Sequence, residues 1–167
     1  MKVTIVYNRQ AVVDYAERWW DEANPQFPNF HVDCTNFVSQ CLLAGGAPMR
    51  GAPNRQRGWW LSADHSNWSF SWSVAHSLRW YLETSTQGLR ATKVASADQL
   101  TIGDVILYDF AGDGRVDHST IVTSVHDGVP YVHAHTANSA DRLYNYENST
   151  AYTPAIQYYF FKIADQF

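Results

Sequence analysis

Hydrophobic and polar positions change their spacing about halfway along the chain. In the first half, apolar residues recur at the three- and four-residue intervals typical of amphipathic helices. This spacing predicts helices over residues 9–22, 33–44 and 69–84. In the second half, alternation and short apolar runs instead predict strands over residues 89–94, 105–110, 117–125, 131–135 and 155–163.

Turn signals separate these predicted elements. Gly45 and Gly46 are suited to end the second helix, and Asp127-Gly128 predicts a tight hairpin between two strands. Helices followed by a meander of strands predict an α+β fold, with the N-terminal helices packed on one antiparallel sheet. The length of 167 residues fits a single domain over residues 1–167.

Composition and charge argue against several kinds of partner. The net charge is −4 and no run is rich in lysine or arginine, so nothing predicts nucleic-acid binding. No apolar stretch approaches the roughly 20 residues of a membrane helix. We therefore expect no nucleic-acid or membrane partner, no cofactor and a monomer. The N-terminal apolar part is too short for a signal peptide, and the chain can equally be one domain of a longer secreted protein.

Cys34 is the leading candidate for chemistry. It follows Asp33, a residue type that favours the N-cap and whose carboxylate can accept from the free amides of the first turn. The helix dipole favours negative charge there, which predicts a readily ionised, nucleophilic thiol. The spacing to Cys41 prevents a disulfide within one helix, and we expect Cys41 to be a buried core residue.

A cysteine nucleophile needs a base, and that base needs an orienting group. His118 is the leading candidate for the base because it begins a predicted strand after a loop rich in glycine and aspartate. Across the Asp127-Gly128 turn, paired residue numbers sum to 255, which places His118 on one sheet face with His133 and His135. His135 is the diagonal neighbour and therefore the candidate third residue.

Four short motifs are shared with a known family. They are Asp-Cys-Thr-Asn-Phe-Val at 33–38, Gly-Asp-Val at 103–105, Asp-His-Ser-Thr-Ile-Val at 117–122 and Val-His-Ala at 132–134. In these motifs the chain resembles the NlpC-type cell-wall peptidases, a branch of the papain-like cysteine hydrolases. The resemblance implies a papain-like fold in which helices pack on an antiparallel sheet.

More closely, the chain resembles the putative amidase domain family of Gram-positive bacteria. It shares Gly-Gly-x-Pro-Met, Gly-Trp-Trp, Ser-x-Ser-Trp and Ala-His-Thr-x-Asn, and the match runs from about residue 7 to 161. The resemblance implies Cys34 as nucleophile, His118 as base, and peptidoglycan or a related peptide as substrate. Motif overlay puts the third residue at His133, the Ala-His-Thr match favours His135, and related branches have Asn where Asn138 stands.

The tryptophans divide into two groups. Four lie in or beside the long loop after the second helix: Trp59, Trp60, Trp68 and Trp72. We expect these four to line a substrate groove, with core packing as the alternative. Three fall on apolar helix faces and are expected to build the core: Trp19, Trp20 and Trp80.

Two metal sites compete with cysteine chemistry. The loop at 109–117 is rich in Asp and Gly, yet it lacks the alternation and closing Glu of an EF-hand. Cys34 together with the hairpin histidines has residue types that bind zinc, but the resemblance favours a nucleophile and no metal. The sequence thus predicts a cysteine hydrolase that cleaves an amide bond. A non-catalytic wall- or glycan-binding module and an acyltransferase are the alternative functions.

Overall fold

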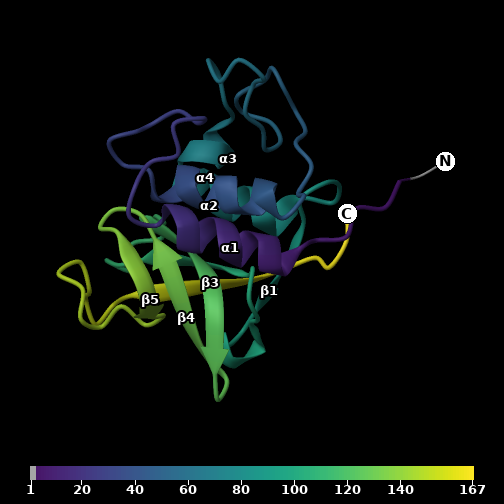
Figure 1. The fold of residues 1–167 in the computed structure, drawn as a ribbon. Helices are drawn as coiled ribbons and strands as arrows, with labels where there is room; N and C mark the ends of the chain where they lie inside the picture. Colours follow the sequence, from purple (N-terminus) through teal and green to yellow (C-terminus); the bar gives the residue numbers. More distant parts are fainter. Residues whose placement is uncertain (1–2) are drawn as a thin grey trace.

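A six-stranded antiparallel sheet forms the base of the fold in a computed structural model that describes residues 3–167 (Figure 1). The strand order is β1-β6-β2-β3-β4-β5. The strands are β1 (Ala91–Val94), β2 (Val105–Asp109), β3 (His118–His126), β4 (Val129–Ala134), β5 (Ser139–Leu143) and β6 (Gln157–Ile163). The predicted antiparallel sheet is confirmed. Residues 1 and 2, which the predicted domain includes, lie outside the described part.

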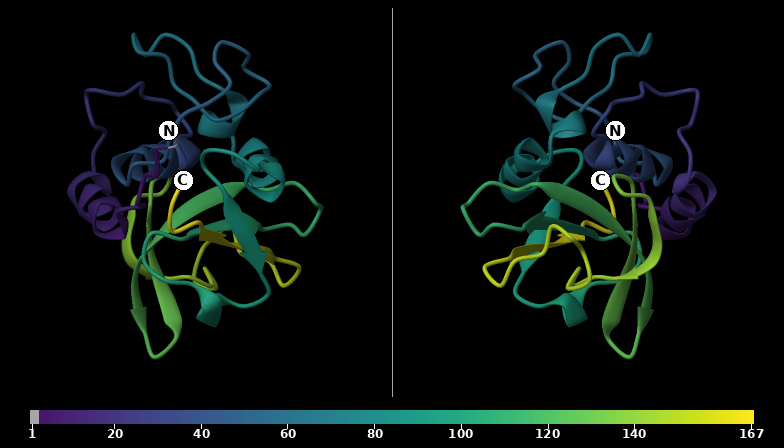
Figure 2. Two further views of the ribbon diagram at one scale, coloured as in Figure 1. Left: turned by 90° about the vertical axis from the view of Figure 1, so that its right-hand side faces the viewer. Right: turned by 90° about the vertical axis from the view of Figure 1, so that its left-hand side faces the viewer.

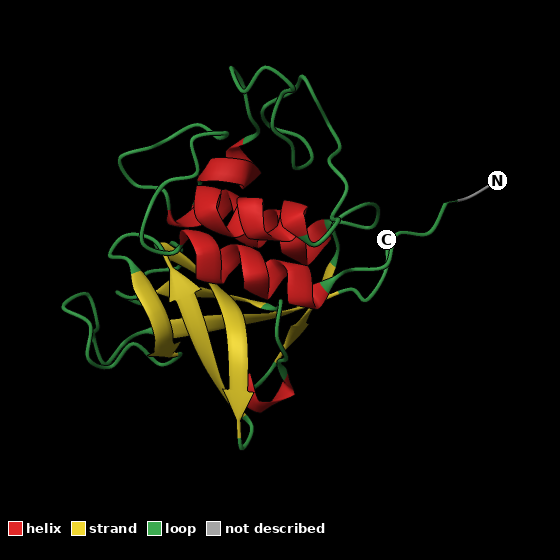
Figure 3. Cartoon of the chain, in the orientation of Figure 1, coloured by secondary structure: helices red, strands yellow, loops and turns green. Residues whose placement is uncertain are grey.

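Helices cover one face of this sheet (Figures 2 and 3). They are α1 (Arg9–Trp19), α2 (Cys34–Ala44), α3 (Phe70–Ser73) and α4 (Ala75–Thr84), and a 3-10 turn η1 (Ala97–Gln99) follows β1. One apolar core lies between the helices and the sheet, and a smaller one covers the opposite face. The predicted α+β arrangement is therefore confirmed. Within residues 3–167, no helix has the length and apolar character required to cross a bilayer.

Helix α2 is buried on all sides along most of its length, which explains why its sequence mixes apolar and polar residues. A buried polar group without a partner costs about 1–3 kcal/mol. The polar side chains of α2 meet partners from neighbouring elements: Thr35 with Ser119, Asn36 with Trp72, Ser39 with Trp59 and Gln40 with Tyr15. These pairs fix the helix, and with it the position of Cys34.

The two glycines end α2 and let α1 approach it. A Cβ atom on Gly45 would lie 2.5 Å from Val12 Cγ2 and 2.6 Å from Tyr7 Cε1, so a larger residue would push the helices apart. Gly46 has φ +96°, a left-handed conformation that favours glycine. The predicted end of the second helix is confirmed.

The predicted helix over residues 69–84 is instead two helices. Val74 is extended, with φ −122° and ψ 122°, and it separates α3 from α4. The buried positions of α4 are Ala75, Leu78 and Leu82. Trp80 is two residues from Leu78 and from Leu82, hence on the opposite side of the helix. It is 50% exposed, so its predicted place in the core is wrong, whereas Trp19 and Trp20 do pack against the core.

The predicted hairpin register holds only close to the turn. His126 pairs with Val129 across Asp127 and Gly128, which confirms the turn. Further along, however, Val122 pairs with Val132, so Thr123 is an extra residue in β3. Such a bulge shifts the register by one residue, and a one-residue shift moves every later side chain to the other face.

The bulge at Thr123 separates the histidines of the hairpin. Ile121, a residue of the core beneath the helices, pairs with His133, so His133 and His135 belong to the helix-covered face. His118 instead pairs with Tyr108, which belongs to the cluster on the opposite face. The prediction that His118 shares a face with His133 and His135 is therefore wrong.

Asp104 of the Gly-Asp-Val motif has a structural role, because it connects α1 to the sheet. Its carboxylate is fully buried and accepts from Arg9 Nη1 at 2.7 Å. The same carboxylate accepts from the backbone N–H groups of Ile163, at 2.9 Å, and Thr101, at 2.8 Å. The N-terminal helix, the start of β2 and the end of β6 thus meet at one carboxylate.

Candidate active site

Cys34 is the first residue of α2 and lies beside the start of β3. Cys34 is 4% exposed, with Sγ 3.8 Å from Thr35 Oγ1, and that hydroxyl lies 2.9 Å from Ser119 Oγ. Cys34 lines a pocket of about 360 Å³, together with residues 73–75 and 115–117. Thr35 thus connects the surroundings of the thiol to Ser119, the residue that follows His118 in the chain. Cys41 is fully buried, and neither cysteine forms a disulfide, both as predicted.

The surroundings of Cys34 contradict the prediction of an easily ionised thiol. Burial raises the pKa of Cys34, since desolvation outweighs the hydrogen bonds from Ser119 and Thr35, and the charge of Asp33 raises it further. Asp33 occupies the N-cap position, but its carboxylate accepts no capping hydrogen bond. The helix start therefore holds a protonated thiol beside a carboxylate.

The carboxylate of Asp33 pairs with His135 instead. Asp33 Oδ2 is 2.8 Å from His135 Nδ1, and the carbonyl oxygen of Trp19 is 2.6 Å from His135 Nε2. The imidazole stacks on Phe37, with ring centroids 4.0 Å apart. Both ring nitrogens of His135 are thus engaged with the end of α1 and the start of α2. Within residues 3–167, His135 forms no hydrogen bond with His118, so the structure does not bring these predicted partners together.

His118 is buried among aromatic rings on the opposite face of the sheet: Tyr108, Phe110 and Tyr146. Its Nε2 lies 3.0 Å from the hydroxyl of Tyr146. Burial lowers the pKa of His118 to about 4, and the nearby Arg142 cation contributes to the shift. The imidazole is consequently neutral near pH 7, the form that a general base requires.

Tyr146 is a site residue that the sequence did not reveal. It lies in the polar segment 138–150, without a helical or alternating pattern, and it is only 3% exposed. Burial raises the pKa of Tyr146 to about 12, so its hydroxyl stays protonated. Two closely spaced aromatic residues in that segment, Tyr144 and Tyr146, were the one available signal that it folds back on the core.

The other candidates for the third residue have different surroundings. His133 Nδ1 contacts Thr123 Oγ1 at 2.7 Å and accepts from the backbone N–H of Asp141 at 3.3 Å. Burial lowers the pKa of His133. Asn138 is exposed. Among the described residues, neither side chain forms a hydrogen bond with Cys34 or His118.

Three of the four tryptophans predicted to line a groove are interior residues. Trp59 and Trp72 are fully buried, and Trp60 is 2% exposed, so none offers a free ring face to a ligand. The indole N–H groups of Trp59 and Trp72 donate to α2. For these three, the prediction of a groove is wrong. Trp68 is half-buried against Phe30 and stays a candidate.

The Asp/Gly-rich loop before β3 is held by the side chain of Asp109, the last residue of β2. The buried carboxylate of Asp109 accepts from the backbone N–H groups of Gly112, Asp113 and Gly114, at 2.9, 3.3 and 2.7 Å. This arrangement explains the composition of the loop without calcium. Across the described residues, no three His, Cys, Asp or Glu side chains are grouped so that they could hold a metal ion.

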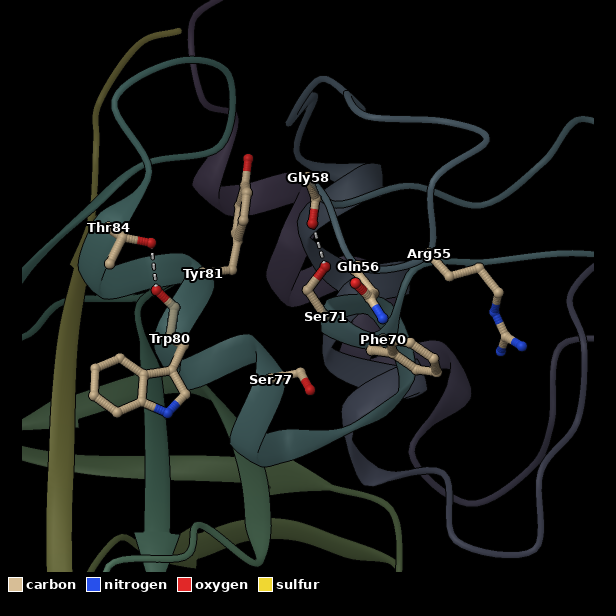
Figure 4. A pocket seen from close by; sticks show the side chains of 9 residues that line it. All are labelled: Arg55, Gln56, Gly58, Phe70, Ser71, Ser77, Trp80, Tyr81 and Thr84. Carbon is tan, nitrogen blue, oxygen red and sulfur yellow. Dashed lines mark hydrogen bonds between the residues drawn. The ribbon is translucent and has the colours of Figure 1, made fainter.

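A separate pocket of about 370 Å³ lies between α4 and the loop at 55–58 (Figure 4). Tyr81 and Ser77 of α4 line it on one side, and Gln56 and Ser71 line it on the other. It contains none of the predicted catalytic residues. The candidate chemistry is therefore confined to the surroundings of Cys34 and His118.

Comparison with known proteins identifies the family. The model of the putative amidase domain matches residues 6–161, so the chain belongs to this family, whose description indicates an amide-bond hydrolase. The chain is similar to two uncharacterized Bacillus subtilis (strain 168) proteins. It is 56% identical to YhbB over 95% of this chain and 51% of YhbB. It is 30% identical to YjcM over 79% of this chain and 31% of YjcM.

The chain thus spans about half the length of YhbB and less of YjcM. No solved structure matches it.

Proposed function

We propose that this domain is a cysteine hydrolase that cleaves an amide bond through an acyl-enzyme on Cys34. The observation that carries the proposal is the placement of Cys34, at the start of a buried helix, in a pocket and against the residue after a neutral His118. Family membership supports the amide-bond substrate. The motifs shared with NlpC-type peptidases support the cysteine mechanism and a papain-like fold.

The hydrogen bond to Tyr146 favours one role for the His118 ring. In the tautomer whose Nε2–H donates a hydrogen bond to the Tyr146 hydroxyl oxygen, Nδ1 keeps a lone pair that can take a proton. No hydrogen bond joins Cys34 and His118 in the described residues. Catalytic hydrogen bonds often tighten only when substrate binds, so we infer that the thiol and the imidazole meet in the complex.

The reaction then has two balanced halves. His118 takes the thiol proton as Cys34 Sγ attacks the carbonyl carbon, and the same proton passes to the leaving amine as the C–N bond breaks. Water next attacks the thioester carbonyl carbon and gives one proton to His118, which passes it to Cys34 Sγ as the C–S bond breaks; the thiol is restored, and the carboxylic acid product leaves and loses its proton to solvent. The backbone N–H of Cys34, at the free start of α2, is the expected donor to the oxyanion.

Peptidoglycan peptide is the substrate we infer, on the strength of the motifs shared with cell-wall peptidases. Mass spectrometry of soluble fragments, released from purified walls in ¹⁸O-labelled water, tests the proposal. We expect the wild type to release fragments with one ¹⁸O in each new carboxylate, and Cys34→Ala to release none.

The same experiment separates hydrolysis from its rivals. Fragments joined to an added amine, with no ¹⁸O, would instead indicate an acyltransferase. Release of fragments by Cys34→Ala at the wild-type rate would reject the cysteine mechanism. Binding to walls without any new chain end would leave only the function of a binding module.

A further inference from the structure

A second pocket, of about 350 Å³, lies beside His118 on the face of the sheet opposite the helices. His118 and Tyr146 line it, together with Arg142 of β5 and the segment 148–151. It is distinct from the pocket at Cys34, which is lined by residues of α2, the α3–α4 junction and the loop before β3. Two pockets thus flank the pair of residues to which we assign the chemistry.

Arg142 holds a positive charge in this pocket, and no carboxylate of the described residues forms an ion pair with it. Its guanidinium lies over the Tyr146 ring at 3.9 Å, and it donates to Ser139 Oγ at 3.2 Å and Asn148 Oδ1 at 3.1 Å. These partners are all neutral. Among residues 3–167, no Asp or Glu oxygen lies within 4.0 Å of Arg142, whereas Arg9 and Arg18 both have carboxylate partners.

The surroundings of Arg142 make its charge available to a ligand. The side chain is half-buried, so water screens it less than it screens an exposed arginine. After burial, which is the larger cause at both residues, its charge adds to the lowering of the His118 pKa and offsets part of the rise in the Tyr146 pKa. The contacts with Ser139, Asn148 and Tyr146 hold the guanidinium in place, and a fixed guanidinium favours planar, bidentate anions.

We propose that the pocket at Arg142 binds a free carboxylate of the substrate, close to the amide bond that is cut. A carboxylate carries one negative charge, which a single guanidinium with neutral neighbours can balance. A phosphate dianion carries two negative charges, and one of them would remain unbalanced. The ligand class is therefore a peptide with an acidic side chain or a free carboxyl end near the scissile bond. This inference rests on the proposed function of Cys34 and His118.

Hydrolysis of two matched substrates tests the proposal. One is purified peptidoglycan with free carboxylates, and the other is the same material after carbodiimide coupling to ammonia. We expect the wild type to cut the amidated wall with a kcat/KM at least about tenfold lower. Arg142→Gln should lose this preference, and Arg142→Lys should keep part of it. Arg57→Gln, which removes an exposed arginine that lines a different pocket, should keep all of it.

A binding measurement separates failure of this inference from failure of the proposed function. N-acetylglycine and N-acetylglycinamide are titrated into Cys34→Ala while the ring signals of His118 are followed by NMR. We expect the acid, and not the amide, to shift these signals, and Arg142→Gln to abolish the shift. If the acid alone shifts the signals but the wild type does not cut purified walls, the carboxylate site stands and peptidoglycan is rejected as the substrate. Equal shifts by the acid and the amide, or equal cleavage of the free and the amidated walls, would overturn the proposal of a carboxylate site at Arg142.

Discussion

At the scale of single residues, the buried imidazole of His118 links stability to pH. Its pKa in the folded protein is about 4, below the ordinary value of 6.5. Between these pH values the unfolded chain binds the additional proton, so stability rises with pH and is lost as the pH falls. We expect His118 to account for a loss of about 2 kcal/mol in the free energy of unfolding between pH 7 and pH 4.5.

Urea denaturation at these two pH values measures this contribution. Between these pH values, the free energy of unfolding should fall more for the wild type than for His118→Gln, whose side chain cannot titrate. The difference between the two losses should be about 2 kcal/mol. His126→Gln, which replaces an exposed histidine of the same strand, should behave as the wild type does. Equal losses in the wild type and His118→Gln would show that the pKa of His118 is not lowered.

In the proposed mechanism Tyr146 acts through His118, so removal of its hydroxyl should affect turnover more than folding. Tyr146→Phe keeps the buried ring and removes the hydroxyl that meets His118 Nε2. We expect kcat to fall about tenfold, or about 1.4 kcal/mol, with little change in KM. Steady-state kinetics on wall fragments measures both constants. Tyr144→Phe is the matched control two residues away, and equal kcat values for the two variants would contradict the assigned role.

Individual residues also show where sequence reasoning stops. The sequence placed Cys34 at a helix start, and that position predicts a lowered pKa of its thiol. The sequence does not show how deeply the thiol is buried, and desolvation by burial raises its pKa. Likewise, the aromatic side chains of Trp59 and Trp72 suit a groove or a core equally well. Only the structure shows that their N–H groups satisfy the buried polar residues of α2.

At the scale of elements, His135 connects α1, α2 and the end of β4. It contacts the Asp33 carboxylate and the Trp19 carbonyl. His135→Leu removes both hydrogen bonds and leaves the Asp33 carboxylate with only the longer contact from Thr136 Oγ1, at 3.3 Å, so we expect the free energy of unfolding to fall by about 2–3 kcal/mol. Urea denaturation measures the loss, with His31→Leu as an exposed control. Unchanged stability with a large loss of kcat would instead favour the catalytic role that the sequence predicts.

Most elements follow from local patterns, and the exceptions have physical causes. Periodicity located α1 and α2, and the Asp127-Gly128 turn was correct. The bulge at Thr123 was missed because an extra residue in a strand leaves almost no trace in its composition. Strand β5 was missed because it is a polar edge strand, which is held by its backbone pairing with β4 and has little apolar alternation.

At the scale of the whole molecule, Arg9 and Asp104 hold the helical layer on the sheet. Asp104 is fully buried, while the second partner of Arg9, Asp165, is 91% exposed. Asp104→Asn leaves the guanidinium without its buried carboxylate, and we expect a loss of about 3 kcal/mol or more. Asp165→Asn should cost less than about 1 kcal/mol. Thermal and urea denaturation measure both variants, and similar losses would show that the buried pair does not anchor the helices.

The proposed site depends on this assembly because its two halves belong to different faces of the sheet. Cys34 comes from the helical layer, and His118 with Tyr146 comes from the opposite face. Local motifs in the sequence identified both residues of the proposed site, Cys34 and His118, as candidates. It could not identify their surroundings, since these depend on how β3, β4 and the segment after β5 pack.

The central claim is that Cys34 is the nucleophile, and the two cysteines of α2 offer a matched test. The measurement is the initial rate of peptide release from purified walls by the wild type, Cys34→Ala and Cys41→Ala, each shown to be folded by circular dichroism. We predict that Cys34→Ala loses at least about a thousandfold in rate, or about 4 kcal/mol, while Cys41→Ala, altered in the core of the same helix, retains activity. Wild-type rates in folded Cys34→Ala would contradict the claim.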